Sequence, residues 1–404
     1  MLSKPLTASS LLVARSCSPS ARMPRKSPPT SATLLATSWA SIRNTDNSRN
    51  PLFPWLRTCY SGKVSPKELP LATNPSSRLP GLLYATTEDG LELPVIDVTH
   101  PAFALSHTPE ELDAIYEKHI VEFRNQGSVP PEARELFKSS VIGSAFIASS
   151  GAVLSAIPTY YLKVGGQNVS PSANPIDRAI IASAPATFVR QRLQDMARLL
   201  ADGLKPALTA QPKVPILFTC IAGGAASDTW NALLYLRQEN PALLQDRSVA
   251  VRVLDMDPAA PAFGAQAIAT LTAAGQPLAD VSISWEYLPY NWSNAADLSA
   301  RLAEFGAQQC VSATSSEGGL FEYGSDEEIV ANLQAVHYST GEGAIVVGSV
   351  TRDCESVRLS LAMGAMALRP RALDDFLALA ATAGWQPQAI LERPTNFNLR
   401  LGKL

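Results

Sequence analysis

The stretch formed by residues 214–257 constrains the fold of this chain most strongly. It begins with an apolar run, PILFTCI, which ends at a glycine-containing turn at residues 222–224, and a helix-forming run, TWNALLYLRQEN, follows. A second apolar run, VAVRVLD, then stops at Asp255, with Asp257 two residues further on. Strand, glycine turn, helix, strand and acid in this order are typical of a doubly wound sheet that binds the adenosine half of a cofactor at the carboxyl ends of its strands.

The charge of the chain is unevenly distributed. Of its 404 residues, 46% are hydrophobic and 17% are charged, which indicates a globular protein with a large core. Residues 1–67 carry ten Lys or Arg and one acid, whereas residues 68–404 carry 23 basic and 35 acidic residues. A folded part with this excess of acids repels phosphate backbones, so we expect a small-molecule substrate and no nucleic acid.

The five cysteines form no CxxC pair and no Cys/His pattern. Cys220 and Cys310 lie in apolar segments, where a thiol usually fills space. We therefore expect a reducing compartment, no disulfide framework and no metal site.

Residues 1–70 are predicted to be a disordered leader. The first 67 residues contain 19 Ser or Thr, scattered Arg and many prolines, and they show no sustained apolar period. In a eukaryotic chain this composition resembles an organellar transit peptide, and a solvated tail or a start placed too far upstream explains it equally well. No apolar segment of a secretion signal follows the early charges, so the expected location is cytoplasmic, or organellar if the leader is a transit peptide.

Residues 71–185 are predicted to form a mainly helical N-terminal cap. A hairpin with its turn at Asp89 and Gly90 comes first, and a helix opened by a capping box of Thr108 and Glu111 follows. Residues 139–162 carry no charge, but Pro158 and many Ser and Gly residues favour a buried pair of helices over a membrane span.

Residues 186–404 alternate between strand and helix patterns, which predicts a parallel sheet covered on both faces. A helix with apolar residues at helical spacing opens this part and is expected to end near Gly203. The chain ends with two β-rich runs, PQAILERP and FNLRLGKL, which are joined by a turn at Thr395 and Asn396. Strands so close in sequence cannot form a parallel crossover, so they must pair antiparallel.

Several segments carry a resemblance to a known superfamily. A parallel α/β sheet whose last element is an antiparallel hairpin strand, after a helix ending in AGW, resembles the class I S-adenosylmethionine-dependent methyltransferase fold. The segments IAGGAASDTWNALL, VLDMDPAAPAFGAQAI, SSEGGLFEYGSDEEIVANL and VVGSVTRD also look like a group of bacterial methyltransferase-like proteins. The resemblance covers residues 186–404 and implies a Rossmann-like domain that binds S-adenosylmethionine.

The resemblance also assigns candidate cofactor residues. It places the methionine part of the cofactor over the turn and near the start of the next helix, the ribose at the end of the second strand, the adenine after the third strand, and substrate with cofactor after the fourth. The implied residues are Ala222, Gly223, Gly224 and Asp228 for the methionine part, Asp255 or Asp257 for the ribose, Asn291 and Trp292 for the adenine, and Ser315 with Ser316 and Glu317 for the last position. The turn reads AGGAAS where the family commonly has three glycines, so Ala225 and Ala226 depart from the pattern.

Methyl transfer needs alignment of nucleophile and methyl group and, for a protonated nucleophile, a base. Glu317, at a predicted strand end beside two glycines, is the candidate base, although a solvated loop acid is a plain alternative. His100 and His107 flank PAFALS in the cap and are the next candidates.

The leading hypothesis is therefore methyl transfer to a small molecule. A non-enzymatic binding protein with the same fold is the first alternative. A NAD(P)-dependent oxidoreductase is the second, and the missing GxGxxG and the terminal hairpin strand weigh against it.

Overall fold

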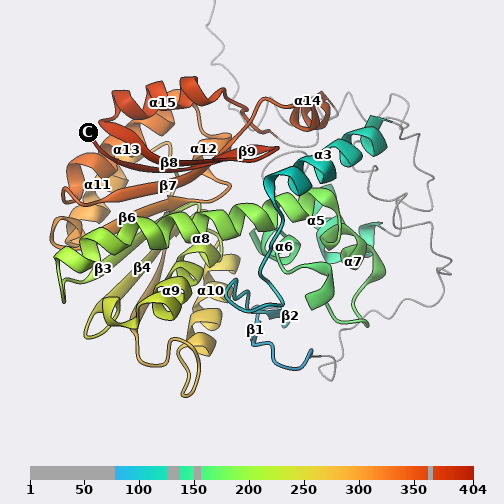
Figure 1. Ribbon diagram of the computed structural model, residues 1–404, viewed down its shortest axis with the longest axis horizontal. Coiled ribbons are helices and arrows are strands. Elements are labelled where there is room, and N and C mark those ends of the chain that lie inside the picture. The colour runs from blue at the N-terminus through green and yellow to red at the C-terminus, as the bar shows by residue number, and fades with distance from the viewer. Residues whose placement is uncertain (1–77, 125–136, 150–155, 363–366) are drawn as a thin grey trace, which may run out of the picture. The chain divides into compact units, whose positions relative to one another are not determined.

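The centre of the protein is a seven-stranded sheet with the order β5-β4-β3-β6-β7-β9-β8 (Figure 1). The computed structural model describes residues 78–124, 137–149, 156–362 and 367–404. The strands are β3 (Ile216–Ile221), β4 (Ser248–Asp255), β5 (Ser282–Pro289), β6 (Val311–Ser316), β7 (Ile345–Thr351), β8 (Trp385–Glu392) and β9 (Asn396–Lys403).

The pairing of these strands confirms the predicted doubly wound sheet. Strand β3 pairs parallel with both β4 and β6, and β5 and β7 extend the parallel set at either side. Strand β9 pairs antiparallel with β7 and with β8, as the short turn at Thr395 and Asn396 requires. The carboxyl ends of β3, β4, β5, β6 and β7 therefore meet at one edge of the sheet.

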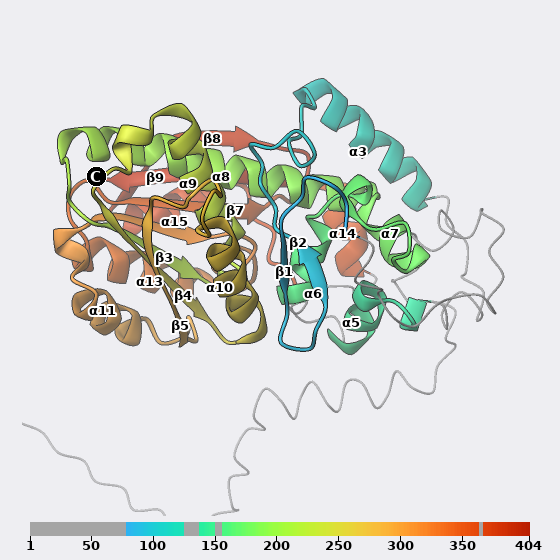
Figure 2. The same ribbon diagram turned by 90° about the horizontal axis from the view of Figure 1, so that it is seen from below.

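Helices cover both faces of the sheet (Figures 1 and 2). On one face lie α8 (Ala184–Ala210), α9 (Ser227–Glu239) and α10 (Ala259–Leu271), and on the other α11 (Ala295–Glu304), α13 (Asp326–Ser339) and α15 (Leu373–Thr382). Successive side chains of a strand point to opposite faces of the sheet, so each buried strand contributes to the apolar core on both faces. Phe218 packs in one of these cores and its neighbour Leu217 in the other. Short elements join these layers: η5 (Pro241–Leu243), η6 (Ala307–Gln309), α12 (Leu320–Tyr323) and α14 (Glu355–Ala362).

The residues before the sheet form a hairpin and several helices. The hairpin consists of β1 (Tyr84–Thr86) and β2 (Glu92–Pro94), paired antiparallel around the predicted turn. The elements that follow are α3 (Pro109–Arg124), α5 (Val141–Ser149), α6 (Ala156–Leu162), η4 (Gly166–Asn168) and α7 (Pro175–Ile181). Thr108 and Glu111 cap α3 reciprocally, at 3.3 Å and 2.9 Å, so the capping box is confirmed.

Helix α8 is longer than its sequence suggests. The prediction that it ends near Gly203 is wrong, because the helix continues through Pro206 to Ala210. A Cβ on Gly203 would lie 2.4 Å from Cδ of Arg400 and 2.6 Å from Cδ1 of Ile345. The glycine therefore serves the close packing of α8 on strands β7 and β9, and not the end of the helix.

All described residues belong to one compact unit, Ser48–Leu404, and the division into a cap and a sheet domain at residue 185 stays a prediction. The predicted leader at residues 1–70 lies outside the described residues. Within the described ranges, no helix combines the length and the apolar character that a membrane crossing requires.

Candidate functional site

The turn after β3 is held against the end of β4 by backbone geometry. Ala222 and Gly224 have positive φ angles of 50° and 53°. The N–H of Ala222 donates to the Leu254 carbonyl at 2.7 Å, and the N–H of Gly224 donates to Oδ2 of Asp255 at 2.8 Å. A Cβ on Gly223 would lie 2.6 Å from Cβ of Cys220, so this glycine is required by the turn's own packing.

Asp255 ends β4 beside this turn. Its Oδ1 accepts a bond from the N–H of Asp257 at 3.0 Å, while Asp257 accepts one from the N–H of Ala259 at the start of α10. Burial raises the pKa of Asp255 above its ordinary value although these donors oppose the rise. A carboxylate has about four lone-pair sites, so acceptor capacity remains for a ligand hydroxyl. Met256, between the two acids, has 69% of its surface exposed, which leaves an apolar side chain open at the sheet edge.

The loop after β5 is fixed next to Asp255. The N–H of Tyr290 donates to the Asp255 carbonyl at 3.0 Å, and the amide of Asn332 donates to the carbonyl of Trp292 at 2.7 Å. Asn291 is exposed, and its side chain accepts a bond from the N–H of Ser293 at 3.0 Å within the loop. The structure thus brings the predicted ribose and adenine residues to one edge.

Asp228 is buried in the first turn of α9, only 2% exposed. Its Oδ1 accepts a bond from the N–H of Thr229 at 2.9 Å, whereas Oδ2 has no hydrogen-bond partner among the described residues. Burial, and then repulsion by Glu317, raises the pKa of Asp228 to about 6, although the Ser315 hydroxyl and the positive charge of Lys163 offset part of the rise. The Ser315 hydroxyl therefore lies near the carboxylate, but it does not reach Oδ2 with hydrogen-bond geometry. An acceptor left unpaired in the interior is costly unless a ligand meets it.

Glu317 is held by two cations. Lys163 pairs with one carboxylate oxygen, and Nε of Arg192 lies 2.9 Å from the other, while Nη1 of Arg192 pairs with Glu322 at 2.9 Å. Burial by itself would raise the pKa of Glu317, but the charges of Lys163 and Arg192 outweigh it and hold the pKa below its ordinary value. The base role of Glu317 stays a prediction, and this geometry weighs against it, since a carboxylate held in two ion pairs is a weak proton acceptor.

Sequence reasoning missed Lys163 and Arg192. Their side chains are only 7% and 12% exposed, and both converge on Glu317. For Arg192, a signal that could have been used was its place beside Leu193 on a helix with apolar residues around it. Lys163 directly follows the uncharged run 139–162, as Lys138 directly precedes it, and this position beside a largely apolar segment was the available signal for its burial.

His100 makes none of its described contacts with Glu317 or Asp228. It is exposed, and its Nδ1 accepts a bond from the N–H of Ala102 at 3.2 Å in its own loop. His107 is partly buried, and its Nδ1 has no partner among the described residues. The described contacts link neither ring to Glu317 or Asp228.

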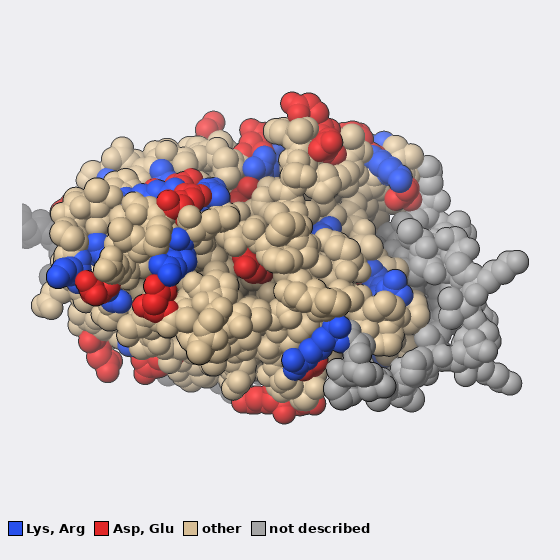
Figure 3. Space-filling view, turned by 60° about the horizontal axis from the view of Figure 1, so that its bottom comes forward, with Lys and Arg blue, Asp and Glu red and all other residues tan. Residues whose placement is uncertain are grey.

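The described ranges contain no group of His, Cys, Asp or Glu side chains suited to a metal ion. On the face drawn in Figure 3, Lys and Arg side chains lie in small groups, mostly next to acids, and broad uncharged areas separate them. This face shows no continuous basic field of the kind that tracks a phosphate backbone.

Comparison with known proteins gave structural neighbours only. No protein-family model matches the chain, and no curated protein matches it. A possible exported protein from Bordetella parapertussis is 16% identical, with 74% of this chain and 99% of that chain covered and a TM-score of 0.45. Magnesium protoporphyrin IX methyltransferase from Synechocystis PCC 6803, solved with bound SAH, is 12% identical over 55% of this chain and 87% of that chain, with a TM-score of 0.37.

A complex of LepI with SAM is 20% identical over 50% of this chain, with a TM-score of 0.32. The match spans 46% of the LepI chain, less than half of its length. The fold assignment rests on this protein's own strand order and on its antiparallel β9, which are those of the class I methyltransferase-like fold.

Proposed function

We propose that this protein transfers a methyl group from S-adenosylmethionine to a small-molecule acceptor. The observation that carries the proposal is the buried carboxylate of Asp228, whose Oδ2 is unpaired among the described residues. It follows the turn that binds Asp255 through the Gly224 N–H. An unpaired acceptor at this place fits the α-ammonium group of the cofactor's methionine part, and Asp255 fits the ribose diol.

Each residue of the proposed site has a separate task. Asp228 and the turn at residues 222–224 hold the methionine part of the cofactor, and Asp255 holds its ribose. Met256 and the Asn291–Trp292 loop flank its adenine. The bound cofactor would supply an electrophilic methyl group. Lys163 and Arg192 hold the Glu317 carboxylate in a fixed position beside Asp228.

The affinity for S-adenosylhomocysteine tests the ribose assignment without needing an acceptor. Asp255→Asn and Asp257→Asn are a matched pair of variants, each of which removes one carboxylate, at positions two residues apart. Since a charge-assisted hydrogen bond contributes about 1.5 to 3 kcal/mol, we expect the first variant to bind at least about tenfold more weakly and the second to bind like the wild type. Calorimetric titration of the full chain measures both.

The other results of this titration are equally informative. If only Asp257→Asn weakens binding, the ribose role belongs to Asp257. If S-adenosylhomocysteine does not bind the wild type, or if neither variant changes its affinity, the proposed site is wrong. Tight binding of NAD in place of S-adenosylhomocysteine would support the oxidoreductase alternative.

The variant Glu317→Gln distinguishes a role of Glu317 as catalytic base from a role in positioning Lys163 and Arg192. If Glu317 is the base, turnover with an acceptor falls about 10²- to 10⁴-fold while the affinity for S-adenosylhomocysteine stays constant. If Glu317 instead holds Lys163 and Arg192 in place, the affinity itself changes, because both cations lose a charged partner. Tight cofactor binding without turnover on any acceptor would favour a non-enzymatic binding protein.

A further inference from the structure

The buried charges at the carboxyl edge of the sheet do not balance. The Asp228 cluster consists of two cations and three acids, none more than 12% exposed: Lys163, Arg192, Glu317, Glu322 and Asp228. The two cations pair with Glu317 and Glu322, whereas Asp228 forms no ion pair with a described residue. When the Asp228 carboxylate is ionised, the cluster therefore keeps one negative charge that no described cation balances.

The two oxygens of Asp228 have different surroundings. Oδ1 accepts a bond from the N–H of Thr229 at 2.9 Å, whereas no described residue donates to Oδ2. The thiol of Cys220 also lies close, but burial raises its pKa to about 12, so it stays neutral. Without a ligand, Oδ2 is thus the oxygen that takes up a proton, because a neutral carboxyl costs less to bury than an unpaired carboxylate.

A proton and a ligand ammonium group compete for this oxygen. Burial and then the charge of Glu317 raise the pKa of Asp228 to about 6, against the opposing effects of the Ser315 hydroxyl and Lys163. At about pH 5 most of the ligand-free protein therefore carries the proton, and at about pH 8 almost none does. An ammonium group beside Oδ2 favours the ionised carboxylate, so it expels the proton.

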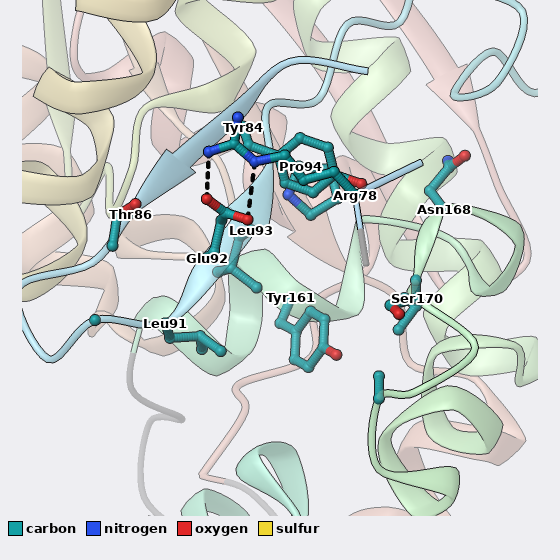
Figure 4. A pocket seen from close by; sticks show the side chains of 13 residues that line it. Arg78, Tyr84, Thr86, Leu91, Glu92, Leu93, Pro94, Tyr161, Asn168 and Ser170 are labelled. Carbon is teal, nitrogen blue, oxygen red and sulfur yellow. Dashed lines mark hydrogen bonds and ion pairs between the residues drawn. The ribbon is translucent and has the colours of Figure 1, made fainter. Parts of the chain in front are cut away.

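The hollow beside the N-terminal hairpin shows the opposite arrangement of charge. It has a cavity volume of about 150 Å³, and Figure 4 shows Arg78 and Glu92 paired at its edge. Arg78 donates to both carboxylate oxygens of Glu92, from Nε at 3.0 Å and from Nη2 at 2.5 Å, so each charge is satisfied by the other. Of the buried carboxylate oxygens in the described ranges, only Oδ2 of Asp228 lacks a hydrogen-bond partner.

We propose that Asp228 recognises the amino group of the cofactor by its charge and takes up this ammonium group in exchange for its own proton. The carboxyl loses the proton from Oδ2 to the solvent, and the ammonium group keeps its three protons and pairs with the carboxylate that remains. The ligand thereby supplies the positive charge that the Asp228 cluster lacks. The exchange rests on the proposed binding of S-adenosylmethionine, whose amino group it requires.

Calorimetric titration of the full-length protein with two ligands tests this exchange. S-adenosylhomocysteine carries the amino group, whereas 5′-methylthioadenosine keeps the adenosine and the sulfur but lacks the amino-acid part. Because the proton occupies Oδ2 in most of the ligand-free protein at about pH 5, S-adenosylhomocysteine should lose about tenfold more affinity than 5′-methylthioadenosine between about pH 8 and about pH 5. The pKa of Asp255 is also raised, but both ligands carry the ribose, so its effect is common to both.

The released proton is measured by repeating the titrations at about pH 5 in two buffers with different enthalpies of ionisation. S-adenosylhomocysteine should release close to one proton more than 5′-methylthioadenosine does. In Asp228→Asn, which cannot titrate, this difference disappears, and the affinity for S-adenosylhomocysteine at about pH 8 falls at least about tenfold. Asp113→Asn, on the exposed face of α3, is the matched control and should behave like the wild type.

The possible results separate this exchange from the methyl-transfer proposal. If both ligands bind with the same pH dependence and the same proton release, the exchange is wrong and cofactor binding stands. If neither ligand binds at either pH, the methyl-transfer proposal fails and the exchange fails with it. If Asp228→Asn keeps the pH dependence of the wild type, another group releases the proton and the role of Asp228 is overturned. Circular dichroism at both pH values checks that each protein is folded.

Discussion

Replacing Asp228 by Asn tests whether its buried carboxylate destabilises the ligand-free protein. The pKa of Asp228 rises from an ordinary 3.8 to about 6 on folding. Between these values the unfolded chain has lost the proton that the folded protein still binds. The free energy of unfolding of the wild type therefore falls as the pH rises from about 4 to about 6 and is level above that. The free energy of unfolding of the wild type falls by about 3 kcal/mol in total, and that of the Asn variant is free of this decrease because its side chain does not titrate.

Urea unfolding at about pH 5 and about pH 8 measures this effect. By the same linkage, the stability of Asp228→Asn relative to the wild type should grow by about 1.4 kcal/mol between the two conditions. Asp113→Asn, on the exposed face of α3, is the matched control and should show no such growth. A relative stability of Asp228→Asn that is equal at both pH values would refute the reasoning, because the carboxylate would then titrate alike in both states.

Two further substitutions test the packing beneath the site. Gly348→Ala places a Cβ 2.1 Å from the ring of Phe321, so we expect the free energy of unfolding, measured in urea, to fall by about 1 to 3 kcal/mol. In the control Gly343→Ala, the new Cβ meets its nearest atom at 3.6 Å, and the loss should be less than about 1 kcal/mol. Equal losses would show that the Phe321 ring moves aside freely. Arg371→Leu removes the guanidinium that donates to the carbonyls of Phe321 at 3.0 Å and Gly324 at 2.7 Å, so both acceptors lose a buried partner and stability should fall by about 2 to 5 kcal/mol. A loss below about 1 kcal/mol would mean that water replaces the arginine.

The fold was predictable because its signals are local. The alternation of apolar runs and helical periods located the strands of the sheet, and the short turn at Thr395 and Asn396 required an antiparallel last pair. Ser325 followed three residues later by Glu328 is a further local signal of this kind, and the two residues form a capping box at the start of α13, with bonds of 2.8 Å and 3.2 Å. Helix α7 has a comparable local signal in the sequence, since Asn174 caps it and Pro175 opens it.

The ion pairs around Glu317 were not predictable from the same signals. Lys163 and Arg192 lie 154 and 125 residues before Glu317 in the chain, and no periodicity reports that such residues meet. Charged residues are also expected at the surface, so burial of both partners has to be read from the packed structure. The extension of α8 past Gly203 was missed for a related reason, because the contact that requires the glycine comes from Arg400.

The segment from Pro94 to Val98 is held mainly by side chains that come much later in the chain. The hydroxyl of Tyr160 donates to the Pro94 carbonyl at 2.7 Å, and the indole of Trp230 donates to the Ile96 carbonyl at 2.8 Å. Asn231 accepts from the Val98 N–H at 2.8 Å, across 133 residues. During synthesis on the ribosome, this segment emerges well before its partners exist. Its backbone N–H and C=O groups must therefore remain hydrated, or bound by a chaperone, until Trp230 and Asn231 have left the exit tunnel.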